Sequence, residues 1–210
     1  IGINSDDVIT GNIGSSKRME FTAIGDGVNL TSRIESATKL YGCSIIISEN
    51  TYAQCKDTIW VRELDYVCVK GKRQPVLLYE VLGLRSQPLS PAQHEQVALY
   101  EKGRIHYQQR KFDLAIDTFS SLLRATPEDP ATRLYLNRCQ QLQQHPPTSD
   151  WDGSWQLQEK WAWSPSHTWW GITVIGLWTM YKIYIKTVSL NDDIVTIWTI
   201  KPSRCITLER

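Results

Sequence analysis

Hydrophobic residues in the first 84 positions fall into two patterns that alternate along the chain. Short runs of apolar and β-branched residues, such as those at 43–48 (CSIIIS) and 76–82 (VLLYEVL), have the length and composition of strands. The segment 26–42 instead places apolar residues every three or four positions, which is the spacing of a helix with one buried face. The region is therefore predicted to mix strands and helices.

The helical segment has recognisable ends. Asp26 is a candidate N-cap, because its carboxylate can accept hydrogen bonds from free amides of the first turn. Gly42 is expected to end the helix, and Lys39 lies in the last turn, where a positive charge suits the helix dipole. The buried stripe is predicted to consist of Leu30, Ile34, Ala37 and Tyr41.

Two polar residues, Asn29 and Arg33, lie off this stripe, just after the tight turn Gly25-Asp26-Gly27. The amino end of a helix carries free N–H groups and partial positive charge, so it suits an anion. Arginine adds a fork of donors that matches phosphate oxygens. From spacing alone a solvated polar face is the simpler interpretation, so a phosphate site is at this point one of two readings of the pair.

Composition divides the chain into four regions, at 1–84, 85–94, 95–144 and 145–210. The second is a linker with Pro and Ser, and the third is polar and helical with regular apolar positions. The fourth is a tail with eight of the nine tryptophans, interpreted as partly disordered or aberrant. Its stretch 169–185 is about as long as the shortest membrane spans but contains Lys182. A non-native extension, an interfacial or buried segment and a membrane helix are the three interpretations of that stretch.

Bulk composition narrows the class of protein. With 41% apolar residues, 210 residues can bury a core, and a net charge of +1 argues against nucleic acid or an anionic membrane as a partner chosen by charge. The five cysteines fit no metal-ligand spacing and are interpreted as reduced thiols of a cytosolic chain. No signal peptide is evident, and the opening IGINSDDVITG reads as a strand already under way, which suggests a fragment.

Residues 1–84 closely resemble the second half of the class III nucleotide cyclase catalytic domain. The likeness lies in the stretch from IGINSDDVITG through FTAIGDGVNLTSRIESATKLYGCSIIIS, and in the later VRELDYVCVKGKRQPVLLYEV. It is nearest to adenylate cyclases of the cyanobacterial type. The resemblance implies an N-terminally truncated ferredoxin-like α+β sandwich followed by an α-helical hairpin or repeat. It also implies conversion of ATP to cyclic AMP and pyrophosphate in intracellular signalling, at sites built from both chains of a head-to-tail homodimer.

The resemblance assigns roles to individual positions. GDGVNLTSR places the ribose-orienting asparagine at Asn29 and the transition-state arginine at Arg33. Thr22 falls where many bacterial relatives recognise the adenine edge, although an ordinary strand residue is also consistent with threonine there. The turn VKGK places a phosphate-contacting lysine at Lys72, with Lys70 as the weaker candidate, and an exposed hairpin turn is the plainer interpretation of both.

The resemblance also implies two divalent ions, Mg²⁺ or Mn²⁺, which clamp the attacking and leaving oxygens. Their aspartates are expected before the position of Ile1, so the isolated chain is expected to be inactive, and Asp6 and Asp7 are not recruited as substitutes. Without its first strands the sheet is expected to expose an unpaired edge. We expect a cytoplasmic location, with membrane association of a full-length protein left open.

The stretch 99–127 resembles a tetratricopeptide repeat. Gly103, Ala115, Phe119 and Pro127 follow the order of small, large and proline positions in that repeat, and 131–143 begins a further helix. The resemblance implies a protein partner or support of a dimer. An amphipathic hairpin that packs back on the catalytic region is the alternative. The corresponding alternative function is a non-catalytic scaffold that uses this repeat beside a degenerate cyclase half.

Overall fold

The structure, a computed structural model, describes residues 1–15, 18–68, 74–157, 181–190 and 193–202. Strands and helices are mixed, which confirms the predicted α+β class. The helices are α1 (Asp26–Tyr41), α2 (Glu49–Cys55), α3 (Pro91–Gln108), α4 (Phe112–Ala125) and α5 (Pro130–Gln144). The strands are β1 (Gly2–Ser5), β2 (Ile9–Ser15), β3 (Arg18–Ile24), β4 (Ile46–Ser48), β5 (Ile59–Cys68), β6 (Val76–Leu84), β7 (Trp155–Gln156), β8 (Tyr181–Leu190) and β9 (Asp193–Pro202).

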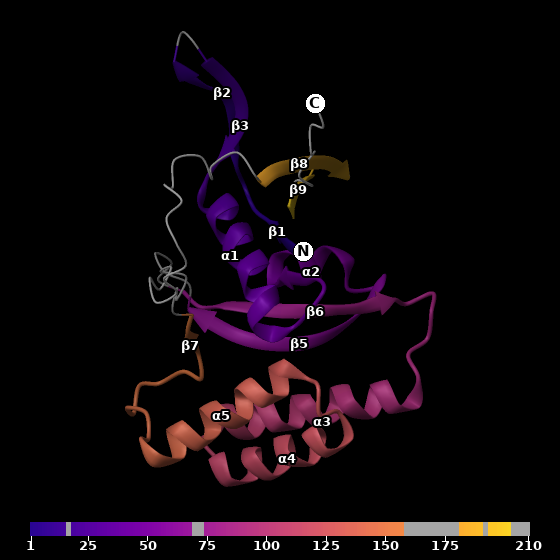
Figure 1. Ribbon diagram of the computed structural model, residues 1–210, viewed down its shortest axis with the longest axis vertical. Coiled ribbons are helices and arrows are strands. Elements are labelled where there is room, and N and C mark those ends of the chain that lie inside the picture. The colour runs from indigo at the N-terminus through magenta and orange to yellow at the C-terminus, as the bar shows by residue number, and fades with distance from the viewer. Residues whose placement is uncertain (16–17, 69–73, 158–180, 191–192, 203–210) are drawn as a thin grey trace, which may run out of the picture.

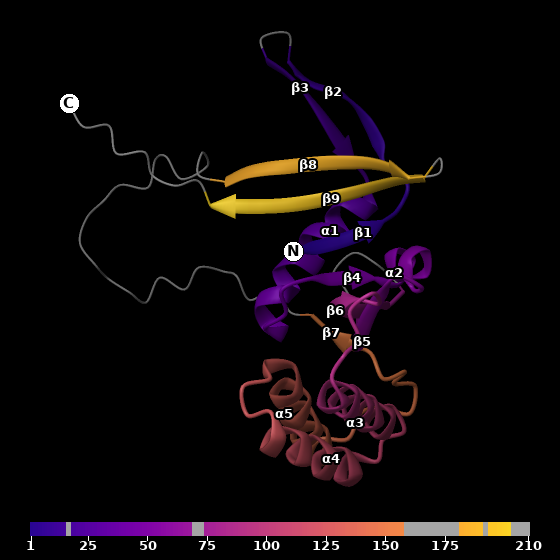
Figure 2. The same cartoon turned by 90° about the vertical axis from the view of Figure 1, so that its right-hand side faces the viewer.

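One sheet organises the molecule, with its strands in the order β7-β5-β6-β4-β1-β9-β8. β1 and β4 pair in parallel, whereas β4 with β6 and β6 with β5 are antiparallel. β2 and β3 form a separate hairpin that projects away from the sheet (Figure 1). The helices α3, α4 and α5, which we call the helical layer, lie beside β5 at one end of the sheet, and the β8–β9 hairpin lies at the other (Figure 2).

Helix α1 forms where its apolar spacing predicts. The four stripe residues are buried, and Gly42 ends the helix in a left-handed conformation at φ 68°. The prediction that Asp26 is the N-cap is wrong. Gly25 is the N-cap, because its carbonyl accepts the first bond of the helix, from the Asn29 N–H at 3.3 Å. Asp26 lies instead in the first turn, where its negative charge still complements the helix dipole.

Two glycines let α1 lie unusually close to β1. A Cβ built on Gly2 would be 2.3 Å from the backbone nitrogen of Glu35, and one on Gly27 would be 2.5 Å from the Cβ of Asp6. Neither position can carry a side chain without moving the helix or the strand. The contact of Gly2 thereby sets the middle of α1 against β1, and the contact of Gly27 sets the first turn of α1 against the residue that follows β1.

The helical layer shares one hydrophobic core with the sheet. Buried residues of α1, β4, β5 and β6 form a single cluster with Tyr100, Ala115, Phe119 and Tyr135 of the layer. Gly103 of α3 permits the close approach of α4 that its spacing predicts, since a Cβ there would be 2.6 Å from the Phe119 ring. The helical layer therefore packs back on the sheet.

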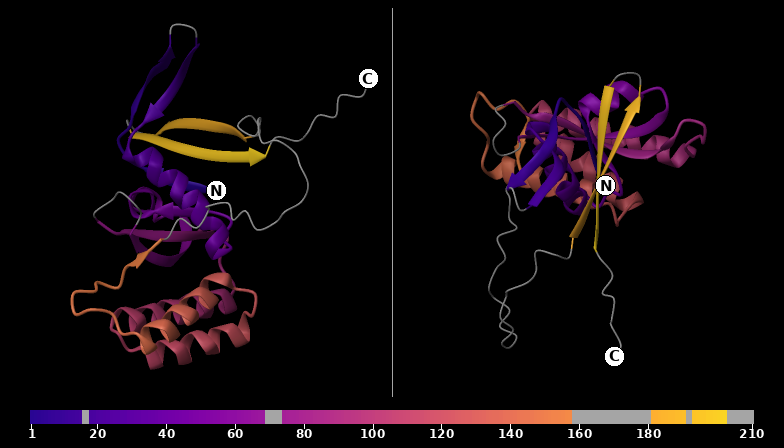
Figure 3. Two further views of the ribbon diagram at one scale, coloured as in Figure 1. Left: turned by 60° about the vertical axis from the view of Figure 1, so that its left-hand side comes forward. Right: turned by 90° about the horizontal axis from the view of Figure 1, so that it is seen from above.

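The far edge of β1 is paired in this structure. β9 runs antiparallel to it from Gly2 to Ser5, so the edge that we expected to be exposed is covered over that stretch (Figure 3). Most of the hydrophobic stretch 169–185 lies outside the described residues, and its last five positions begin β8. Within the part of the chain that the structure describes, no helix combines the length and apolar character needed to cross a membrane.

Candidate functional site

The amino half of α1 presents the two polar residues that the sequence analysis singled out. Asn29 is exposed and Arg33 is half-buried, one turn apart on the helix. Neither belongs to the buried stripe, whose members face the core. The structure therefore brings an amide and a guanidinium together on one accessible side of the helix, next to its amino end, as the spacing predicts.

One side-chain hydrogen bond joins this end of the helix to β1, and a second lies within the helix. The carbonyl oxygen of Gly27 accepts from Asn4 Nδ2 at 3.2 Å and from Thr31 Oγ1 at 2.7 Å. Both donors are buried, with 2% and 1% of their surface exposed. Together with the close contact of Gly27 with the Asp6 side chain directly after β1, the Asn4 bond leaves the first turn of α1 little freedom to shift against β1.

The structure gives less information about the other candidate site residues. Thr22 lies in β3 opposite Gly11, two residues before the strand ends and the chain turns into α1. The positions of Lys70 and Lys72 lie outside the described residues. The structure thus unites two of the four predicted site residues, Asn29 and Arg33, and provides a strand for the third.

No metal centre is formed by the residues that the structure describes. Among them, no group of three or more His, Cys, Asp or Glu side chains could hold an ion. Asp6 and Asp7 lie beside the amino end of α1, where the Asp6 carboxylate accepts a hydrogen bond from the Asp7 backbone N–H at 3.0 Å. The described residues therefore do not fit the two-ion site that the sequence resemblance implies.

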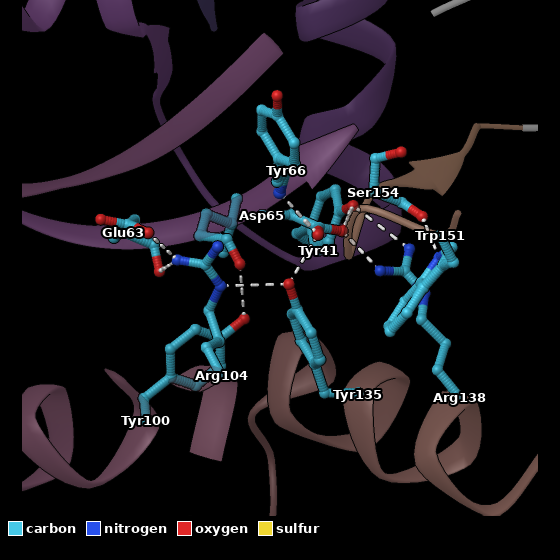
Figure 4. A network of polar contacts seen from close by, with 11 residues as sticks. Tyr41, Glu63, Asp65, Tyr66, Tyr100, Arg104, Tyr135, Arg138, Trp151 and Ser154 are labelled. Carbon is cyan, nitrogen blue, oxygen red and sulfur yellow. Dashed lines mark hydrogen bonds and ion pairs between the residues drawn. The ribbon is translucent and has the colours of Figure 1, made fainter. Parts of the chain in front are cut away.

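A second polar feature lies at the opposite end of α1, and the sequence analysis did not anticipate it. We call it the Asp65 network; it joins α1, β5 and α5 (Figure 4). The Asp65 carboxylate accepts hydrogen bonds from the hydroxyls of Tyr41 and Tyr135, the latter at 2.6 Å, and from Arg138 Nη1 at 2.5 Å. Arg138 Nη2 also donates to the Tyr41 hydroxyl at 3.4 Å. All four side chains are at most 2% exposed.

Burial dominates the electrostatics of this network. It raises the pKa of the Tyr41 hydroxyl well above its ordinary value, and the adjacent Asp65 carboxylate raises it further. Burial alone would lower the pKa of the Arg138 guanidinium, but the Asp65 carboxylate and the two tyrosines more than offset this, so that pKa is raised. Both tyrosines therefore stay protonated, and Arg138 stays charged, throughout the physiological pH range.

Further contacts tie the neighbouring residues of β5 to the helical layer. Arg62 donates to both carboxylate oxygens of Asp129, at 2.6 and 3.1 Å. Arg104 forms an ion pair with Glu63, and the Tyr100 hydroxyl donates to the Leu64 carbonyl at 2.9 Å. The available signal was the sequence RELD inside an otherwise strand-like run, because charged side chains that are buried in a strand need partners.

Comparison with known proteins shows what the amino-terminal part of the chain is similar to. The sequence model described as the adenylate and guanylate cyclase catalytic domain matches residues 1–83. The terminal-differentiation-specific adenylate cyclase of Dictyostelium discoideum is 33% identical over 142 residues, covering 66% of this chain and 7% of that protein. The adenylate cyclase of Anabaena cylindrica is 43% identical over 84 residues, covering 39% of this chain and 17% of that protein.

Solved structures are also similar to part of the chain. The adenylyl cyclase CyaB from P. aeruginosa is 40% identical, with a TM-score of 0.36 and coverage of 42% of this chain and 44% of that one. The chain spans less than a fifth of the length of the curated relatives named above. The family match includes β1, α1, β4, β5 and nearly all of β6. Residues 1–83 of this chain are therefore similar to the catalytic domain of adenylate and guanylate cyclases.

Proposed function

We propose that this chain supplies one half of an adenylate cyclase active site, with Asn29 and Arg33 as its catalytic residues. The observation that carries the proposal is the position of this pair. Both residues lie on the accessible side of a helix whose amino end is locked to β1, inside the segment that matches the cyclase family. A rigid helix is a suitable platform for residues that must be held to a fraction of an ångström.

The proposed reaction converts ATP to cyclic AMP and pyrophosphate. The ribose 3′-oxygen forms a bond to the α-phosphorus, the bond from that phosphorus to the bridging oxygen of pyrophosphate breaks, and the hydroxyl proton is lost. Negative charge shifts over the phosphoryl oxygens during this exchange. Arg33 would stabilise that charge, as arginines do in other phosphoryl transfers, where their contribution is roughly 10³–10⁵ in rate.

The other residues have binding roles in this proposal. Asn29 would hold the ribose so that its 3′-oxygen lines up with the leaving group, which is a positioning function. Thr22 would contact the adenine edge, and Lys72 would contact the phosphates. These two assignments rest on the sequence resemblance.

The site would be completed by a second chain. We propose a head-to-tail dimer in which the partner supplies the groups that bind the divalent ions, Mg²⁺ or Mn²⁺. Such ions neutralise the phosphates and activate the hydroxyl when they are bound. Since the described residues do not fit a metal site, we assign no step of this kind to the present chain. Assayed by itself with ATP and Mn²⁺, the chain is expected to make no cyclic AMP.

Complementation tests the proposal. The Anabaena cylindrica adenylate cyclase, altered to Ala at its own positions aligned with Asn29 and Arg33, is mixed with this chain, ATP and Mn²⁺. We expect cyclic AMP synthesis to return, and Arg33→Ala in this chain to lower it at least ~100-fold with little change in ATP affinity. Failure of the unaltered chain to restore synthesis, or equal rescue by Arg33→Ala, would count against the proposal and favour a non-catalytic scaffold.

A further inference from the structure

Helix α1 is held at both ends, and by different parts of the molecule. Its amino end is fixed to β1 by the hydrogen bond from Asn4, and Gly27 packs against Asp6 directly after that strand. Its carboxyl end meets α5. The Tyr41 hydroxyl bonds to Asp65 and receives a hydrogen bond from Arg138 of α5. A helix that is held at both ends is fixed in orientation as well as in position.

Backbone packing reinforces the second attachment. Gly42, directly after α1, lies so close to α5 that an added Cβ would be 2.5 Å from the Cγ of Pro130. Pro130 is the first residue of α5, so this contact and the Asp65 network join the same two helices. Arg33 precedes Tyr41 by eight residues, which is about 12 Å along a helix. A tilt at the carboxyl end therefore moves the guanidinium of Arg33.

The ion pair between Asp65 and Arg138 lies at the centre of the network and fixes the place where the Tyr41 hydroxyl binds. Asp65 is 0% exposed and Arg138 is 2% exposed, so neither can exchange its partner for water. The Tyr41 hydroxyl touches both charges, and no other residue of α1 takes part in the described hydrogen bonds of this network. The hydroxyl is thus a polar connection between α1 and the helical layer.

We propose that α5 positions the catalytic helix through this connection, so that Tyr41, Asp65 and Arg138 are positioning residues for Arg33. The inference rests on the function proposed above and assigns to the helical layer a role in that same site. The sequence comparison agrees with a role that includes the helical layer. Similarity to the Dictyostelium discoideum cyclase covers 66% of the chain and so continues past residue 83 into the helical layer, where the family match has ended.

The structure offers a matched pair of variants. Tyr41→Phe and Tyr135→Phe each remove one buried hydroxyl that donates to the Asp65 carboxylate, and each leaves the aromatic ring and the Asp65–Arg138 ion pair in place. Tyr41 belongs to α1, whereas Tyr135 belongs to α5. A merely structural role predicts similar consequences for both variants. A positioning role predicts consequences for the site from Tyr41→Phe alone.

Activity is measured with the complementation mixture described above, using the full 210-residue chain. We expect Tyr41→Phe to lower the turnover number roughly 3–10-fold, with KM for ATP changed less than about 2-fold, because misplacement of a catalytic group acts mainly in the transition state. The turnover number of Tyr135→Phe should stay within about 2-fold of that of the unaltered chain. Its denaturation midpoint should nevertheless fall by about as much as that of Tyr41→Phe. Equal turnover for the two variants would overturn the proposal.

A second measurement does not depend on activity. Amide hydrogen exchange of the chain alone, followed by mass spectrometry, should show faster exchange across α1 in Tyr41→Phe than in Tyr135→Phe. Equal protection of α1 in both variants would refute the attachment even if no cyclic AMP were formed. The Arg33→Ala variant in the complementation assay distinguishes a failure of the proposed function from a failure of the positioning role. If that variant still restores synthesis, the proposed function fails, and the exchange comparison alone then decides whether α5 holds α1.

Discussion

Replacement of Arg138 by Met is the most direct probe of how the helical layer is joined to the sheet. The side chain is 2% exposed, and its Nη1 donates to the fully buried Asp65 carboxylate at 2.5 Å. Its guanidinium also lies over the Trp155 ring, 4.5 Å from the centroid. Methionine retains much of the apolar bulk but removes the charge. The substitution therefore leaves a carboxylate buried without its cation.

The expected loss follows from that uncompensated charge. Breaking a buried ion pair by removing one partner typically costs ~3–5 kcal/mol, more than the net gain from forming the pair, because the remaining charge stays desolvated. The two tyrosine hydroxyls and the Tyr66 backbone N–H, which donates at 2.7 Å, still solvate Asp65 and place the expected value at the lower end of that range. For a chain of this size, this corresponds to a fall in melting temperature of roughly 6–20 °C.

Urea denaturation followed by tryptophan fluorescence and far-ultraviolet circular dichroism measures the change. Arg124→Met is the control, because Arg124 is exposed and donates to the Ser121 hydroxyl, and it should change stability by less than about 0.5 kcal/mol. The double variant Asp65→Asn with Arg138→Met should recover part of the loss, since no buried charge remains. A loss below about 1 kcal/mol for Arg138→Met would refute the idea that this pair is desolvated in the folded chain.

Three further predictions test other parts of the structure. Gly103→Ala should destabilise the chain by about 1–3 kcal/mol in the same denaturation assay despite its better helix propensity, because its Cβ would overlap the Phe119 ring; unchanged stability would contradict the packing of α3 on α4. The pKa of Asp129 is lowered because hydrogen bonds from the guanidinium that it pairs with outweigh the opposing effect of burial. That stabilisation is present above the ordinary aspartate pKa and is lost as pH falls through the lowered value, so Asp129→Asn should flatten the decline in stability below about pH 4. Burial raises the pKa of the Cys139 thiol to about 12, so peptide mapping after iodoacetamide treatment at pH 8 should find it unmodified while half-exposed Cys55 reacts; rapid modification of Cys139 in the folded chain would contradict its burial.

Local patterns in the sequence were sufficient for the individual elements. The apolar spacing of α1 and its ending at Gly42 are confirmed, because a helix needs only a periodic apolar face and a residue that tolerates a left-handed turn. The strand predicted at 76–82 appears as β6, whereas only the last three residues of the stretch 43–48 form a strand, β4. The position of Asn29 and Arg33 off the buried stripe also followed from spacing, although their roles in catalysis are proposals.

The sequence by itself therefore determined the helix α1, the strand β6 and which residues of α1 face away from the core. Tertiary structure decided how the helical layer is attached. Asp65 and Arg138 are 73 positions apart, and no local pattern indicates that a charge in a strand will meet an arginine on a distant helix. Pairing of β9 with β1 is likewise a long-range event. Such contacts depend on which surfaces the whole chain brings together, since burial makes a charge favourable only where its partner is buried with it.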